Sequence, residues 1–161
     1  MSEEKLRQQV SDAFKNRAIL YFLIFDELRK ELGEERAEEI MKRAIYRRGV
    51  QKGEKYKPYA PGNFEGLRDA FVSGVPDDGR LFDPNVLRCD ADGLDVNLEN
   101  CPLKEAWEEI ELGEEDRVTM CRIAGEIDKG TFEAAGFDFE PDTWQPGRTG
   151  CCHLHIRRKN A

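Results

Sequence analysis

The chain has 161 residues, of which 39% are hydrophobic and 36% are charged, so it can bury a core beneath a heavily solvated surface. Its formal net charge of −8 argues against a general nucleic-acid binder, because such binding depends on neutralising phosphates. No apolar run reaches the roughly 18 residues that a membrane span needs, so we expect no membrane partner. With five cysteines and a polar start unlike a signal peptide, we expect a cytoplasmic protein with free thiols.

The first half of the chain has the spacing of helices. Apolar residues recur at helical intervals through residues 3–32, and Gly33 is well placed to end that helix. A second helix is predicted from about Glu34 to Gly49, acidic at its start and basic at its end, as the helix dipole favours. These two helices would form a hairpin, and the long first helix could also support a homodimer. A short helix is predicted over 64–72.

The second half changes character. Residues 86–90 and 94–98 flank an Ala-Asp-Gly turn and predict a β-hairpin. Pro102 suits the first turn of a helix that ends near Leu112, and another helix is predicted from Glu114 to Lys129. The final strand is predicted over 151–157.

This order of elements predicts an α+β fold, with a helical hairpin packed against a small antiparallel sheet and further helices. Residues 137–143 are irregular or strand-like by pattern. We expect a single domain over residues 1–161, with a mainly helical part at 1–72 and a strand-helix-strand part at 86–157 that carries the cysteine motifs.

Cys101 is the strongest single candidate for chemistry. It stands directly before Pro102, at the start of a predicted helix. There, unpaired backbone N–H groups and the helix dipole stabilise a thiolate and lower the thiol pKa. The alternative is a cysteine that only caps the helix or fills the core.

The second cluster is Cys151, Cys152, His153 and His155, which includes both histidines of the chain. A histidine beside a thiol is the usual base in nucleophilic catalysis. Strand alternation, however, places Cys152 with Leu154 on one face and puts Cys151 with the two histidines on the other. The plainer alternative is that Cys152 faces the core while the histidines lie on the surface.

A metal site made from Cys101, Cys151, His153 and His155 is chemically possible, because zinc accepts such ligands in tetrahedral geometry. No C-x-x-C or H-E-x-x-H spacing supports it. We therefore expect neither a metal nor another cofactor.

Taken together, these residues resemble the L-2-amino-thiazoline-4-carboxylic acid hydrolase family. The matching pattern is Asn-x-x-x-Cys-Pro at residues 97–102, followed on the helix by the aromatic residue Trp107. A cysteine-bearing helix follows, around Cys121, with acidic residues Glu126 and Asp128 after it.

The similarity extends over most of the chain, from about Asn16 to Ile156, and includes a glycine shortly before the last cysteines, here Gly147. The family pattern has an aromatic residue after Cys-x, whereas this chain has Leu154. Its two histidines are likewise not part of the family pattern, so they could retune the site or change the substrate.

The resemblance implies hydrolytic opening of a thiazoline ring at C2 of a cyclic amidine. Cys101 would attack C2 or activate the attacking water, and Asn97 would donate a hydrogen bond to the developing charge. Cys152, His153 or His155 would move protons.

We assign the substrate contacts to Asp128, which would hold the amidine, and to Cys121 and Trp107. Two other classes of function remain open. One is a small-molecule-binding or sensor domain with inert thiols, and the other is a Cys/His metal-binding protein.

Overall fold

The computed structural model describes residues 1–160 and confirms the predicted α+β fold. The elements of the first half are α1 (Glu3–Leu32), α2 (Glu34–Gly53), the 3-10 helix η1 (Glu54–Tyr59) and α3 (Phe64–Ser73). Those of the second half are β1 (Pro84–Cys89), β2 (Gly93–Leu98), α4 (Pro102–Glu109), α5 (Glu114–Ala124), α6 (Glu126–Ala135), β3 (Phe137–Asp142) and β4 (His153–Arg158). In this part of the chain, no helix is both long and apolar enough to cross a membrane.

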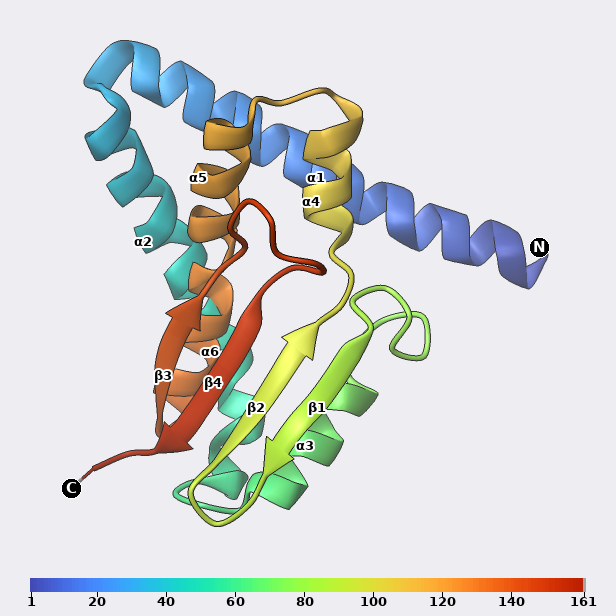
Figure 1. Cartoon of the computed structure of the whole chain (residues 1–161), viewed down its shortest axis with the longest axis vertical. Helices are drawn as coiled ribbons and strands as arrows, with labels where there is room; N and C mark the ends of the chain where they lie inside the picture. Colours follow the sequence, from blue (N-terminus) through green and yellow to red (C-terminus); the bar gives the residue numbers. More distant parts are fainter. Residues whose placement is uncertain (161) are drawn as a thin grey trace.

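The four strands form one antiparallel sheet in the order β1-β2-β4-β3, so the last strand lies between β2 and β3 (Figure 1). The segment predicted as irregular or strand-like is a regular strand, because it pairs with β4 from Phe137 to Asp142. The final strand begins at His153 rather than at Cys151. This later start changes which residues share a face of the sheet.

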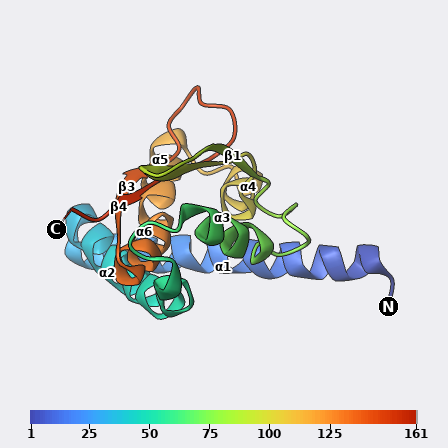
Figure 2. The same cartoon turned by 90° about the horizontal axis from the view of Figure 1, so that it is seen from below.

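Helices α1, α2, α3 and α6 lie on one side of the sheet, as the view from below shows (Figure 2). There, α3 and α6 pack against the strands and bury a cluster around Phe132, Leu94 and Ile156. A second cluster, around Trp107 and Phe25, lies where α1 packs on α2 and α4. The two apolar clusters hold the sheet and the long helices together, and the space where they meet contains the candidate site.

Helix α2 continues to Gly53, beyond the end predicted at Gly49. Gly49 and Gly53 both face α6, and a methyl group at Gly49 would overlap the carbonyl oxygen of Ile127. On the opposite helix, a methyl group at Gly130 would overlap the carbonyl oxygen of Tyr46. The two helices therefore touch backbone to backbone, which only residues without a side chain allow.

The helix predicted over 114–129 is two helices, which meet at Gly125. The second, α6, runs on to Ala135 and ends at Gly136, whose φ of 103° is the left-handed conformation that commonly ends helices. Asp128 therefore lies in the first turn of α6 and not near the end of a long helix. This position turns it towards the interior of the molecule.

Candidate active site

A cavity of about 240 Å³ lies where the two core clusters meet. Phe82 and Cys152 pack against both clusters and mark this boundary. The walls are largely apolar, but a set of polar and reactive side chains also lines the cavity: Arg17, Lys52, Lys55, Tyr56, Cys101, Cys121, Asp128, Cys151 and Cys152. Apolar walls with a few convergent polar groups are typical of small-molecule sites.

Cys101 is the N-cap residue of α4, with Pro102 at the first helical position, as the sequence predicted. The turn before it is held by the Asn100 side chain, whose amide donates to the carbonyl of Leu81 over 3.2 Å. The backbone of Cys101 is extended, with φ −148° and ψ 112°, which suits the residue before a proline and turns the chain sharply into the helix.

The pKa of Cys101 is lowered from its ordinary value. The largest cause is the thiol of Cys151, which acts as a hydrogen-bond donor to the Cys101 sulfur. Burial opposes this effect, and the backbone N–H groups of Lys104 and Leu103 add to it. These N–H groups do not make a capping hydrogen bond of regular geometry, so we ascribe their effect to the positive end of the helix.

Cys151 has the opposite character. Its pKa is raised by the neighbouring thiols of Cys101, Cys121 and Cys152, and by burial. Its sulfur lies 3.8 Å from that of Cys152. In this cluster Cys101 is therefore the sulfur that ionises, while Cys151 stays protonated and donates a hydrogen bond to it.

Backbone hydrogen bonds fix the position of this cysteine pair. The amide of Cys151 donates to Leu98 and the amide of Leu98 donates to Cys152, each over 2.9 Å. Gly150, with φ 82°, makes the turn just before them, where its backbone passes close to Leu98 and Glu99. The end of β2 thus ties the Cys151-Cys152 segment next to the start of α4.

The prediction that Cys151 shares a face with His153 and His155 is wrong. The strand alternation on which it rested does not reach Cys151, because β4 begins only at His153. Cys151 instead turns into the cavity, next to Cys152.

Asp128 brings a carboxyl group to the same cavity. Burial raises its pKa to about 6, and the opposing effect of Lys52 is smaller. Because Gly49 and Gly130 allow α2 to approach α6 so closely, Lys52 near the end of α2 reaches the cavity that Asp128 lines. A carboxyl group poised near neutral pH can accept a proton or hold a cationic group.

Three cationic side chains also line the cavity: Arg17, Lys52 and Lys55. The Arg17 guanidinium stacks on the ring of Phe14 at 4.5 Å, and its Nε is buried without a hydrogen-bonding partner among residues 1–160. Burial lowers the pKa of Lys52, and the carboxylate of Asp128 offsets part of this. An unpartnered buried donor and an excess of positive charge suit a ligand with an anionic group.

Trp107 and Cys121 contribute to the apolar part of the wall, as their assignment to substrate contacts requires. Trp107 is fully buried, and its Nε1 donates to the carbonyl of Ala18 over 2.8 Å. This bond fixes the indole ring against α1, so the ring forms a rigid wall.

Asn97, His153 and His155 do not reach the cavity. In β2, the buried side chains of Val96 and Leu98 face the helices, so Asn97 between them points to the opposite face of the sheet. The register pairs Asn97 with His153, which places both on that outer face together with His155. The structure therefore separates these three residues from the cysteines.

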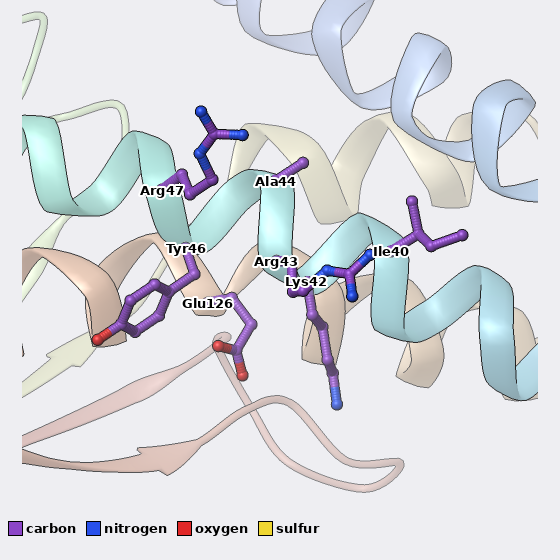
Figure 3. A pocket seen from close by; sticks show the side chains of 7 residues that line it. All are labelled: Ile40, Lys42, Arg43, Ala44, Tyr46, Arg47 and Glu126. Carbon is purple, nitrogen blue, oxygen red and sulfur yellow. The ribbon is translucent and has the colours of Figure 1, made fainter.

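A second depression, of about 450 Å³, lies on the surface of α2 and is bounded by Glu126 of α6 (Figure 3). Lys42, Arg43 and Arg47 project around it, and no thiol lines it. It lacks the reactive groups that distinguish the interior cavity.

Sequence reasoning missed the cationic side of the site. Arg17 lies within the apolar face of the first helix, and Lys52 and Tyr56 come after the predicted end of the second helix at Gly49, although the structure places them in α2 and η1. The available signal was an arginine within an otherwise apolar helical face, which indicates a buried charge that needs a partner.

Comparison with known protein families gives one match: the model of the L-2-amino-thiazoline-4-carboxylic acid hydrolase family covers residues 12–156. No curated protein matches the chain.

Proposed function

The chain belongs to the L-2-amino-thiazoline-4-carboxylic acid hydrolase family, and on this premise we propose that it hydrolyses a small cyclic amidine by means of the Cys101 thiolate. The observation that carries the proposal is the position of Cys101. Cys101 lines the cavity at a helix N-terminus, and its pKa is lowered there beside a thiol that donates a hydrogen bond to it. Lowered pKa and a pocket together are typical of a nucleophilic cysteine.

The charges in the cavity support a substrate that carries both a cationic and an anionic group. Above pH 6 the Asp128 carboxylate would hold the protonated amidine, in keeping with its pKa of about 6. The unpartnered Nε of Arg17 would bind a carboxylate on the ring. A sensor domain with inert thiols would be better served by an apolar, uncharged cavity than by this one.

In the proposed reaction, the Cys101 thiolate adds to C2 of the protonated thiazoline, and the bond from C2 to the ring sulfur breaks. This addition removes the negative charge of Cys101, the largest cause of the raised pKa of Cys151, so Cys151 can give its proton to the departing ring sulfur. The ring sulfur leaves as a thiol, and a covalent isothiouronium remains on Cys101. Water then adds to the same carbon and returns a proton to Cys151. The Cys101 thiolate leaves, and the last proton passes by way of Asp128 to solvent.

The remaining residues have supporting roles in this proposal. Backbone N–H groups of Leu103 and Lys104 stabilise the thiolate in the resting state and each time it is released. Cys152, Cys121 and Trp107 shape the wall. Asn97, His153 and His155 take no direct part, since they lie on the outer face of the sheet.

The test combines cysteine reactivity with turnover. We expect Cys101 to be alkylated with an apparent pKa well below the free value of about 8.5, as followed against pH by mass spectrometry for each cysteine. We also expect wild-type protein to release thiol from 2-amino-thiazoline-4-carboxylate. Cys101→Ser should abolish the release, whereas Cys89→Ser should retain it because Cys89 lies outside the cavity.

Two outcomes would contradict the proposal. If Cys101 is alkylated no faster than Cys89, the thiolate mechanism fails. If the thiazoline binds, as measured by calorimetry, but no thiol appears over hours, the cavity belongs to a binding domain and not to a hydrolase.

A further inference from the structure

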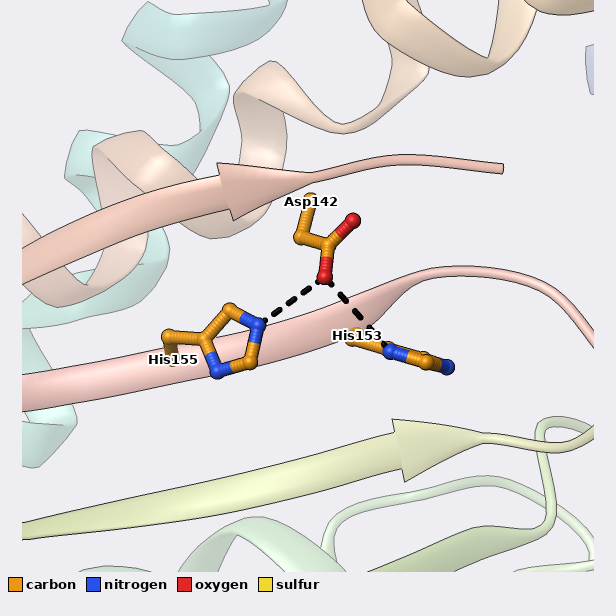
Figure 4. A group of neighbouring side chains, drawn as sticks. All are labelled: Asp142, His153 and His155. Carbon is orange, nitrogen blue, oxygen red and sulfur yellow. Dashed lines mark hydrogen bonds and ion pairs between the residues drawn. The ribbon is translucent and has the colours of Figure 1, made fainter. Parts of the chain in front are cut away.

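The two histidines of the chain lie side by side on the outer face of the sheet, away from the cavity, where the proposed reaction does not use them. His153 and His155 are two residues apart on β4, so their side chains share one face. On the neighbouring strand β3, Asp142 is paired in register with His153. Figure 4 shows the Asp142 carboxylate directed between the two imidazole rings.

The distances in this group suit a metal ion. Asp142 Oδ2 lies 3.0 Å from His155 Nε2 and 3.5 Å from His153 Nδ1. One ligand atom from each residue can be chosen so that all three lie within 4.8 Å of one another. Zinc bonds of about 2.0–2.2 Å in a tetrahedron require ligand atoms about 3.4 Å apart, so small side-chain adjustments would complete the site.

Neighbouring residues orient the ligands from outside. Asp95 Oδ1 lies 2.9 Å from His155 Nδ1, which leaves Nε2 to face Asp142. Arg157 Nη2 lies 2.7 Å from Asp95 Oδ1 and holds that carboxylate in place. Arg148 binds Oδ1 of Asp142 at 2.7 Å and leaves Oδ2 free to act as a ligand. Histidines that bind metals usually donate their other ring N–H to a carboxylate, which fixes the ring tautomer.

Both ring nitrogens of His155 face carboxylate oxygens, and a neutral imidazole has only one N–H. A second proton or a cation is therefore needed between Nε2 and Asp142 Oδ2 once Nδ1 donates to Asp95. Both Nε2 and Oδ2 then carry lone pairs, and at 3.0 Å these repel unless a proton or a cation lies between them. A proton and a metal ion therefore compete for the same position.

We propose that Asp142, His153 and His155 bind one divalent transition-metal ion, with zinc the best match, and leave at least one coordination position open to water or an external ligand. Two imidazoles and one carboxylate favour this class of ion over calcium or magnesium, which prefer oxygen ligands. Each of the three side chains is about a quarter to a third exposed, so an ion can reach the site from solvent.

The proposed site also lies next to the segment that carries the active-site thiols. His153 directly follows Cys152, and Asp142 ends the strand that leads into the same loop. A bound ion would join the ends of β3 and β4 and so restrain the loop over 143–152. We therefore expect the ion to raise the melting temperature of the protein.

Zinc titration followed by NMR of the imidazole nitrogens gives the sharpest test, because the chain has only two histidines. With chelator-treated protein at pH 7.5, we expect one equivalent of ZnCl₂ to shift the signals of both rings, and we expect binding to weaken as the pH falls. Zinc held by the cysteine cluster would leave both rings unchanged. If both rings stay unchanged in folded protein at stoichiometric zinc, the proposal is wrong.

Calorimetry on variants provides the second readout. Asp142→Asn and His155→Gln should each weaken zinc binding more than tenfold. Asp95→Asn should weaken it about 10- to 100-fold, because Asp95 orients the ring of His155. Glu140→Gln is the matched control, since Glu140 lies on the same strand in register with His155 but outside the group.

A further variant, Cys101→Ser, separates the proposed site from zinc bound to thiolates. Equal zinc affinity in Asp142→Asn and Glu140→Gln, with both variants folded by circular dichroism, would overturn the assignment. So would the loss of the histidine shifts in Cys101→Ser.

Discussion

Replacing Asp128 with asparagine should make the protein more stable and less active. The raised pKa of Asp128 means that its ionised form is disfavoured in the folded state. Asparagine keeps the shape of the side chain but carries no charge. The substitution therefore removes the cost of burying a charge together with the group that would hold the amidine.

The magnitude follows from the pKa. A change from 3.8 to about 6 corresponds to about 3 kcal/mol at about 1.4 kcal/mol per pH unit. The loss of an acidic group from the first turn of α6 costs about 0.5 kcal/mol in return. We therefore expect Asp128→Asn to raise the free energy of unfolding by about 2.5 kcal/mol at pH 7.5.

The sign of the pH dependence is fixed by the same shift. Between pH 4 and 6, the folded state binds the proton of Asp128 more tightly than the unfolded state, so wild-type stability falls as the pH rises through this interval. The advantage of Asp128→Asn should thus be absent near pH 4, grow towards pH 6 and stay constant above it. Urea unfolding followed by tryptophan fluorescence at several pH values measures it.

Glu126→Gln is the control on the same helix. Burial also raises the pKa of Glu126, but its side chain lies outside the cavity, so this variant should keep its hydrolytic activity. The argument that Asp128 is a desolvated carboxylate would be refuted if Asp128→Asn were no more stable than wild type at pH 7.5. It would also be refuted if the difference between the two proteins were the same at pH 7.5 as at pH 4.

Three further outcomes test other parts of the structure. Arg17→Met should raise KM for a carboxylate-bearing thiazoline about 10- to 100-fold, because it removes a hydrogen bond to a charged group. It should raise KM less for the methyl ester of the same thiazoline. Equal effects on both substrates in steady-state kinetics would argue against carboxylate binding. Gly49→Ala should cost about 1–3 kcal/mol or more in urea unfolding, because its methyl group would meet the backbone of α6. Gly113→Ala, with open space around it, should change stability little, and similar losses in both would refute the close contact. Glu38→Gln should destabilise the protein by about 1 kcal/mol at pH 7, because it breaks the ion pair with half-exposed Arg122. Since that pair lowers the pKa of Glu38 to about 2, the difference should shrink as the pH falls below 4.5, and a constant difference would contradict the ion pair.

The local features of the fold follow from local sequence. Helical periodicity and Gly33 define α1 and its end, and the Ala-Asp-Gly turn joins two alternating strands. The Cys101-Pro102 pair marks the start of α4 because proline is favoured in the first helical turn whatever the rest of the chain does. These positions depend on neighbours a few residues away, and the sequence contains those neighbours.

The composition of the site was decided by tertiary structure. The sequence predicts a helix end at Gly49, but the helix continues and Gly49 instead lets α2 touch α6. A glycine that ends a helix and one that lets two helices touch look alike in sequence. The starting point of β4 decided that Cys151 faces the cavity, because residues before His153 lie outside the strand and do not follow its alternation. The sequence by itself determined that Cys101 begins a helix. Only packing determined that Cys151, Asp128 and Arg17 meet it, since burial and distance depend on contacts between segments far apart in the chain.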